Sequence, residues 1–360
     1  MRALKSILVR LGMVLVLLGF FFAALEIVFR LAGRFQQDTS KAFYDRSETI
    51  YYPQDSRLHP WSAGASNVLQ IAVIGDSITI GQGVQFDDTY GCRLERLLNL
   101  NTGVPPAEVR IYARGGLSTF MEVHALKMAL KNQPTLVLLG LCHNDTEDFL
   151  RRDEIDRWRE AMLPRVPGPA LAAALRRSRV LAWVYQKIEN ERCKKARLTY
   201  YRRIYDVHYS GWKRFRHALR DFRELTAAAG VRLLVVIFPI VNDLDRDPLA
   251  FTHRQLRQAL EEEGLDYLDL LEVYGNKSPL RMHAVPYVDG HPSEIAHRMA
   301  AEAIFECLLG RGYVDPAYLP QGMKESREGY WQWIQTRMSA PHLQTENAPP
   351  PDDDVPADGR

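Results

Sequence analysis

The sequence predicts an α/β fold built on a parallel β-sheet. Five short apolar runs alternate with segments whose apolar residues recur every three or four positions, the period of a helix that faces a core. Alternation of strands and helices favours a parallel sheet with right-handed crossovers. The run Thr135–Leu141 is apolar almost throughout, as expected of a strand buried on both faces. The predicted strands are 69–74, 109–113, 135–141, 231–238 and 265–270.

Helical patterns fill the intervals between these strands and follow the last one. Pro105 and Pro106 interrupt the first pattern before the second strand begins, because proline lacks the N–H that a helix interior needs. Gly230 suits the C-terminal cap of the helix before the fourth strand. The apolar positions that define the helices are Leu94, Leu97 and Leu98; Val123, Leu126 and Leu130; Trp212, Phe215, Leu219 and Phe222; Leu256 and Leu260; and Ala296, Met299, Ala300, Ala303, Ile304 and Cys307.

The net charge and the cysteine spacing exclude several classes of protein. The net charge of +2 over 360 residues argues against a general nucleic-acid binder, so no nucleic-acid partner is expected. The four cysteines are widely spaced and form no CxxC pair, which excludes the usual zinc motifs and a disulfide framework. We expect free, buried thiols, with a Cys92–Cys142 bridge as the alternative in an oxidising compartment.

The amino terminus predicts a membrane anchor. Leu11–Leu25 carries no charge, and the apolar pattern extends from Ile7 to Phe29, long enough to cross a bilayer. The alternative is a signal peptide cleaved near Ala23 and Ala24. Basic residues precede the segment, so the positive-inside rule places the rest of the chain outside the cytoplasm. We expect a single-pass inner-membrane protein whose main domain lies in the periplasm.

We expect the whole chain to divide into four parts. Residues 1–31 form the anchor, 32–66 a juxtamembrane linker, and 67–340 the main domain. Within that domain, residues 146–211 interrupt the strand–helix alternation as a helical insertion. From Arg151 to Ser210 this insertion has 15 Lys/Arg against 7 Asp/Glu, which predicts a solvated basic face, a lid, or a surface for anionic lipid or acidic polysaccharide. Residues 341–360 are rich in proline and acidic side chains, which predicts a disordered tail.

The first predicted strand runs into a candidate nucleophile. The segment IAVIGDSITIGQG, residues 71–83, places Ser77 directly after the strand, where open α/β sheets bind ligands. Small neighbours would let other groups approach its hydroxyl. An ordinary turn or a phosphate-binding loop would also fit this position, although neither GxxxxGK[ST] nor GxGxxG is present.

Four further residues fit around a serine nucleophile. His291 can act as base and Asp289 can orient it, since both precede the last helix at the same sheet edge. The backbone N–H groups of Ser77 and Gly115 and the side-chain amide of Asn144 can hold an oxyanion. Each also has a structural reading: Asp289 as a turn residue, His291 as a helix-start residue, Gly115 as a turn glycine, and Asn144 as an Asx turn or a helix cap. His143 is the rival base, better explained as pocket lining.

With these motifs the sequence resembles the SGNH (GDSL) hydrolase family. GDSITIGQGV matches the family's serine block, and Gly115, Asn144 and the pair Asp289 and His291 match its other blocks. Three details differ: Ala113 replaces an asparagine, Gly140 lies four residues before Asn144, and the last block is DGH. The resemblance implies a three-layer α/β/α, flavodoxin-like sandwich with a five-stranded parallel sheet.

The resemblance also implies ester cleavage by a serine mechanism that needs no metal or cofactor. Ser77, His291 and Asp289 would be catalytic, and Ser77, Gly115 and Asn144 would form the oxyanion hole. The expected partner is an acyl ester, with an acetylated polysaccharide as one candidate and a lipid as another. Two alternatives remain at this point: an O-acyltransferase of cell-surface polysaccharide assembly and a catalytically silent glycan-binding module.

Overall fold

The structure is a computed structural model that describes residues 2–35, 67–241, 249–275, 277, 279–285 and 289–319. The expected 36–66 part of the linker and the 341–360 tail therefore lie outside the described residues. For some residues within these ranges, Asp289 among them, the structure describes the backbone but not the side chain.

The core of the fold is a five-stranded parallel sheet, as predicted. Its strands run in the order β2-β1-β3-β4-β5, and every neighbouring pair is parallel. This is the flavodoxin-like order, in which the chain direction across the sheet reverses between β1 and β3. The strand bounds are β1 (Leu69–Gly75), β2 (Ala107–Ala113), β3 (Leu136–Leu141), β4 (Arg232–Ile237) and β5 (Tyr267–Asp269).

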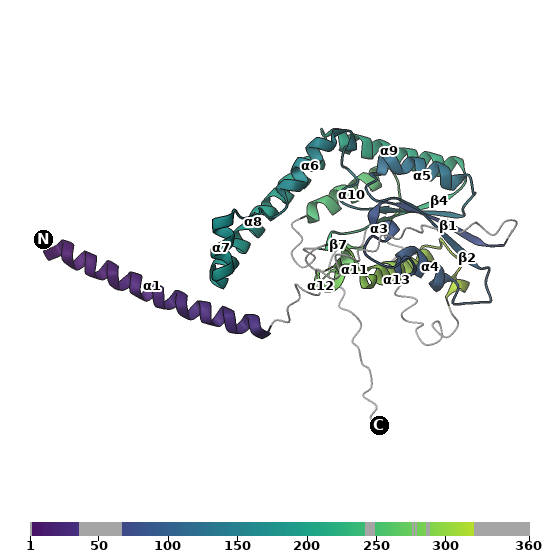
Figure 1. Cartoon of the computed structure of the whole chain (residues 1–360). Helices are drawn as coiled ribbons and strands as arrows, with labels where there is room; N and C mark the ends of the chain where they lie inside the picture. The colour runs from purple at the N-terminus through teal and green to yellow at the C-terminus, as the bar shows by residue number, and fades with distance from the viewer. Residues whose placement is uncertain are drawn as a thin grey trace, which may run out of the picture.

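Helices cover both faces of the sheet and give the expected three layers (Figure 1). On one face lie α4 (Tyr90–Leu98) and α13 (Glu294–Gly310). On the other lie α5 (Thr119–Leu130), α9 (Ser210–Ala228) and α10 (Ala250–Glu262).

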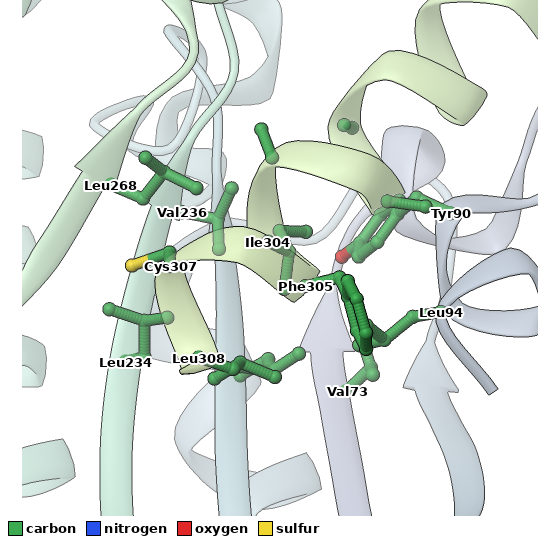
Figure 2. Packing of buried hydrophobic residues seen from close by; sticks show 14 of the residues in the cluster. Val73, Tyr90, Leu94, Leu234, Val236, Leu268, Ile304, Phe305, Cys307 and Leu308 are labelled. Carbon is green, nitrogen blue, oxygen red and sulfur yellow. The ribbon is translucent and has the colours of Figure 1, made fainter. Parts of the chain in front are cut away.

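Alternate residues of each strand serve the two cores. Val73 of β1 packs with Leu94 and Ile304 in the core under α4 and α13, as Figure 2 shows, whereas its neighbours Ala72 and Ile74 belong to the opposite core. Side chains of a strand point alternately to the two faces, so a strand covered on both sides must be apolar at every position. This explains the continuous apolar runs in the sequence.

Two glycines let the helix after β1 approach the sheet closely. This short helix is α3 (Ser77–Ile80). A Cβ at Gly75 would lie 2.0 Å from Thr79 Oγ1, and one at Gly140 would lie 2.7 Å from the same atom. Thr79 also exchanges a 2.9 Å hydrogen bond with the Tyr90 hydroxyl. Any larger residue at Gly75 or Gly140 would push α3 away from the strand ends.

The amino-terminal helix, α1 (Arg2–Phe35), stands apart from the sheet domain (Figure 1). Its segment Arg10–Leu31 has 22 residues with a mean hydropathy of 2.5, and none of it is buried. At 1.5 Å per residue this segment is about 33 Å long, enough for a hydrocarbon core of about 30 Å. By length and composition α1 is therefore a candidate membrane span or signal sequence.

The insertion folds into helices that project from the sheet domain towards α1 (Figure 1). We call residues 152–204 the arm. It consists of α6 (Arg152–Ala161), α7 (Pro169–Arg177) and the long α8 (Arg179–Ile204). The remaining elements are η1 (Phe86–Asp88), η2 (Phe149–Arg151), α11 (Leu271–Tyr274), α12 (Pro279–Met282), β6 (His283–Val285), β7 (Asp289–Pro292) and η4 (Pro316–Tyr318).

All four cysteines are free thiols, as expected. Cys142, Cys193 and Cys307 are buried, and Cys92 is half-buried. The alternative Cys92–Cys142 bridge is not formed.

Candidate active site

Ser77 and His291 meet at the carboxyl end of the sheet. The His291 Nε2 atom lies 2.9 Å from Ser77 Oγ, although the two residues are 214 positions apart. Both side chains are half-buried and line the same cavity. A neutral imidazole in this position can accept the hydroxyl proton, which makes the serine oxygen a better nucleophile. Among the histidines considered from the sequence, His291 is the one that reaches Ser77.

The turn from β1 to α3 fixes the position of Ser77. Asp76 caps α3, because its Oδ1 accepts a 2.9 Å hydrogen bond from the backbone N–H of Ile78. Its other oxygen lies 3.4 Å from Ser77 Oγ and 3.4 Å from Asn144 Nδ2. Gly81 ends the helix after one turn with a φ of +81°, a conformation that favours glycine. Ser77 is therefore held at the first position of a helix, with its hydroxyl facing the cavity.

His291 lies on a short antiparallel hairpin that the sequence pattern did not reveal. Residues 289–292, which the sequence pattern placed only before the last helix, form β7 and pair with β6. The backbone N–H of Ser293 donates a 2.7 Å hydrogen bond to the carbonyl of Met282 and ties the end of this hairpin. Asp289 begins β7, but its side chain lies outside the description, so its expected role as partner of His291 stays a prediction.

Gly115 and Asn144 lie near the serine, as the sequence predicted. Gly115 follows β2, and a Cβ built on it would lie 3.9 Å from the Cβ of Ser77. Asn144 follows β3, is half-buried and lines the cavity. Both residues sit at the carboxyl ends of strands that flank β1, where a parallel sheet gathers its functional groups.

The cavity over Ser77 has a volume of about 440 Å³. Sheet-edge loops supply one part of its wall and the arm supplies another. The lining residues are Ser77, Ile78, Gln82, Gly116, Cys142, His143, Asn144, Glu147, Arg159, Met162, Tyr200, Tyr201, Phe238, Pro239, Ile240, His291 and Pro292.

The arm contributes a polar wall that the sequence did not identify as part of the site. Arg159 Nη2 donates a 2.8 Å hydrogen bond to Glu147 Oε2, and the Tyr200 hydroxyl donates to the other oxygen of the same carboxylate. Burial raises the pKa of Glu147, while the Arg159 charge opposes that shift. No motif marks these residues, because α6 and α8 come together with Glu147 only in the folded chain.

His143 lies in the cavity wall, as the sequence interpretation favoured. It is buried, and burial together with the neighbouring His253 holds its pKa well below the usual value, so the ring is neutral. The His143 and His253 rings are in edge contact, with centroids 4.6 Å apart. His253 Nδ1 lies 2.9 Å from Asp269 Oδ1, and both of these groups are fully buried. His253 thus packs in the interior.

Cys142 is the other potential nucleophile in the cavity wall, but it is poorly suited to that role. Burial and the nearby acidic groups raise the pKa of its thiol well above the ordinary value. Thiolates, not thiols, are the reactive form of cysteine. Its Sγ lies 3.1 Å from Asp76 Oδ2, so it donates to the residue that caps α3.

Buried acidic residues lie behind the serine turn. Glu122 of α5 has no exposed surface, and within the described part of the chain neither of its carboxylate oxygens has a hydrogen-bond partner. Burial, with the charges of Asp145 and Asp76, raises the pKa of Glu122 well above 4.5. Glu122 is therefore expected to retain its proton in the folded protein.

This predicts a pH-dependent stability that Glu122→Gln removes. The unfolded chain releases the Glu122 proton near pH 4.5, whereas the folded chain releases it only at a higher pH. The stability of the wild type therefore falls as the pH rises through this interval. Gln has the same shape and no proton to lose. We expect the variant to be more stable than the wild type at neutral pH, because it has no proton to lose on unfolding.

Thermal denaturation across a pH series measures this effect. The melting temperatures of wild type and Glu122→Gln should converge in acid and separate as pH rises. Glu160→Gln, the same change at an exposed position of α6, should leave the wild-type profile unaltered. Parallel profiles for wild type and Glu122→Gln would contradict the interpretation.

Within the described residues, no group of three or more His, Cys, Asp or Glu side chains is placed to hold a metal ion.

The chain matches one protein family and resembles several solved structures. The family model described as GDSL-like Lipase/Acylhydrolase matches residues 73–299, more than half of the chain. No curated protein matches. Solved structures that resemble the chain include TesA (16% identity, TM-score 0.41), which covers 66% of this chain and 97% of its own.

Two other solved structures are similarly distant. The esterase EstA from Pseudoalteromonas sp. has 14% identity and a TM-score of 0.39, covering 66% of this chain and 95% of its own. An acetylxylan esterase from Geobacillus stearothermophilus has 16% identity and a TM-score of 0.40, covering 65% and 91%. The family match spans both Ser77 and His291, and the chain therefore belongs to the GDSL-like lipase/acylhydrolase family and is a hydrolase of ester bonds.

Proposed function

We propose that the protein is a serine ester hydrolase that works through an acyl-enzyme on Ser77. The observation that carries this proposal is the 2.9 Å separation of Ser77 Oγ and His291 Nε2 inside a cavity. This distance lies within the range in which a base can take a proton from a nucleophile.

The reaction proceeds in two steps. Ser77 Oγ attacks the acyl carbonyl while His291 Nε2 takes the hydroxyl proton; the ester C–O bond then breaks, and His291 returns the proton to the departing alcohol. Water next attacks the acyl-enzyme, again with His291 as base, and releases the acid and free Ser77. For Nε2 to accept a proton, the proton of neutral His291 must reside on Nδ1, which is the atom that Asp289 would orient.

Ser77 N–H, Gly115 N–H and the Asn144 amide would hold the negative oxygen of the tetrahedral intermediate. The support is their place at adjoining strand ends around the serine. Donors fixed before the reaction stabilise the developing charge without reorganisation.

An acylated glycan suits the cavity better than a long-chain lipid. The wall contains the buried Glu147 with its Arg159 and Tyr200 partners, besides Asn144 and Gln82. Polar groups of this kind can pair with sugar hydroxyls, whereas a long alkyl chain would gain little from burial against a polar wall. We therefore assign a short acyl group on a hydroxyl-rich carrier as the substrate class.

The site would face the outer side of the membrane. Arg2, Lys5 and Arg10 precede the apolar segment of α1, and cytoplasmic flanks carry the excess of basic residues. With α1 as an uncleaved span, the domain that follows lies outside the cytoplasm, which in a bacterium is the periplasm.

Hydrolysis of nitrophenyl esters by the full chain in detergent tests the proposal. We expect nitrophenyl acetate to be hydrolysed with a higher kcat/KM than nitrophenyl palmitate, and acetyl groups to be released from an acetylated polysaccharide. No turnover of any ester by a folded chain would contradict the function, and preference for palmitate would contradict the substrate class.

Asn144→Ala tests the oxyanion hole. Loss of one donor should lower kcat by about 10²–10³-fold with little change in KM, because the donor acts on charge that develops in the transition state. Asn132→Ala, a loss of the same amide from the exposed loop after α5, should leave both constants unchanged. A rise in KM with unchanged kcat would instead assign Asn144 to substrate binding.

A further inference from the structure

We propose that the tip of the arm, residues 163–188, is a second membrane contact that lies among the headgroups of an anionic phospholipid bilayer beside the outer end of α1. This inference rests on the proposed role of α1 as a membrane span. It assigns a lipid-binding function to the helical insertion, outside the site of ester hydrolysis.

The composition of the tip is unlike that of the arm as a whole. Between Leu163 and Ile188 there are five basic residues and not one acidic residue, whereas the 151–210 segment as a whole contains both signs. A basic segment without acids is attracted to the negative surface of anionic lipids. The five basic residues are Arg165, Arg176, Arg177, Arg179 and Lys187.

The tip also exposes large apolar side chains. Val166 is 93% exposed and Ile188 61%, values unusual for side chains that gain from leaving water. A surface that combines apolar side chains with Lys and Arg is typical of helices that lie in the bilayer interface. The exposed set is Leu163, Val166, Leu171, Leu181, Trp183, Val184 and Ile188.

This apolar exposure ends where the tip ends. In the rest of α8, from Glu189 to Ile204, no large apolar side chain is exposed, and exposed positions carry residues such as Lys194, Lys195 and Arg202. The change of character along one continuous helix marks a boundary between a surface for lipid and a surface for water.

Contacts with α1 place the tip at the end of the apolar span. Glu26 caps α8: its carboxylate accepts hydrogen bonds from Ser178 Oγ (2.9 Å), Arg179 N–H (3.0 Å) and Val180 N–H (3.0 Å). A carboxylate at a helix N-terminus is favoured because it satisfies free N–H groups and the positive end of the helix dipole. Glu26 is the first charged residue after the uncharged segment that begins at Leu11.

Two further contacts support the same placement. Arg30 pairs with Glu26 at 2.8 Å and donates a 2.9 Å hydrogen bond to the carbonyl of Arg177, the last residue of α7. The Phe29 and Trp183 rings pack with centroids 5.7 Å apart. Tryptophan is enriched at membrane–water interfaces, where its ring meets both apolar and polar surroundings. The tip therefore lies beside the C-terminal part of α1, at the outer end of the candidate span (Figure 1).

The arrangement links the bilayer to the active site. The same helix that carries Trp183 and Ile188 at the tip carries Tyr200 and Tyr201 in the cavity wall. From Arg179 to Tyr200 the helix extends about 30 Å at 1.5 Å per residue. With the tip docked, α8 holds the cavity at a fixed distance from the lipid surface. At that distance the cavity can bind glycans that project from the membrane.

Spin labels on the full chain in vesicles test this proposal. Val184→Cys and Ile188→Cys label the tip, and Lys195→Cys labels the water-facing part of the same helix as the matched control. Three of the native cysteines are buried, and burial raises the pKa of Cys92 to about 11, which slows its reaction with a label at neutral pH. The vesicles contain phosphatidylcholine with one third phosphatidylglycerol.

The quantity measured is the rate at which each label collides with oxygen, which concentrates in lipid, relative to a nickel complex that stays in water. We expect oxygen to dominate at positions 184 and 188 and nickel at 195. We also expect the labels at 184 and 188 to shift towards nickel in vesicles of phosphatidylcholine alone, because the basic residues lose their anionic partners.

The possible failures are distinguishable. Nickel dominance at all three positions, in vesicles that carry the chain, would overturn lipid docking of the tip while leaving the α1 span intact. Failure of the chain to float with vesicles would overturn both the span and the docking. Neither result depends on ester hydrolysis, so the outcome for the tip is independent of the outcome for Ser77.

Discussion

Ser77→Ala should lower kcat/KM for nitrophenyl acetate by about 10⁴-fold or more. The variant keeps the cavity and the oxyanion donors but has no oxygen that can form the acyl-enzyme. The side chain is half-buried at the cavity surface and loses only one atom, so the fold should be retained. Steady-state kinetics measure the loss, and an unchanged melting temperature is the control.

Retention of activity by Ser77→Ala would contradict the mechanism. An effect on KM alone would also contradict it, because a residue that only binds substrate would leave kcat unaltered. The same variant separates hydrolysis from the silent glycan-binding module considered from the sequence, since loss of one hydroxyl would not alter such binding greatly.

His291→Gln should lower kcat/KM by about 10³–10⁴-fold, because no base then takes the Ser77 proton. Gln resembles His in size and can still accept a hydrogen bond, so the position of Ser77 is disturbed little. Kinetics of the double variant give the sharper result. Since serine and histidine act as a unit, Ser77→Ala with His291→Gln should be no slower than Ser77→Ala alone.

His124→Gln provides the matched control. His124 lies on the exposed face of α5, away from the cavity lining, and its loss should leave kcat/KM unchanged. Losses that multiply in the double variant would contradict the proposal, because independent contributions would mean that His291 does not act through Ser77.

The sheet could be predicted from the sequence because its strands are buried on both faces. Ile71, Val73 and their neighbours must all be apolar, so each strand appears as a continuous run between helical patterns. Ser77, Gly115 and Asn144 follow three such runs, and parallel strands bring their carboxyl ends together. His291 could be predicted because it precedes the final helix at that same edge.

The parts that escaped prediction depend on contacts between distant residues. Arg159 and Tyr200 enter the cavity wall through their bonds to Glu147, 12 and 53 positions away. Glu26 caps a helix that begins 153 positions later, and no local sequence pattern predicts such a cap. The acid-free stretch at 163–188 is visible in the sequence, but a charge count over 151–210 averages it with the acidic residues on either side.

The most direct test of the central claim is covalent labelling of the wild-type chain with a fluorophosphonate, followed by mass spectrometry of its peptides. The phosphorus is attacked by the activated serine oxygen and fluoride leaves, so the adduct identifies the nucleophile itself. We predict a single adduct on Ser77, none in Ser77→Ala, and much slower labelling in His291→Gln. An adduct on another residue, or no adduct on a folded wild-type chain, would contradict the assignment of Ser77 as the nucleophile.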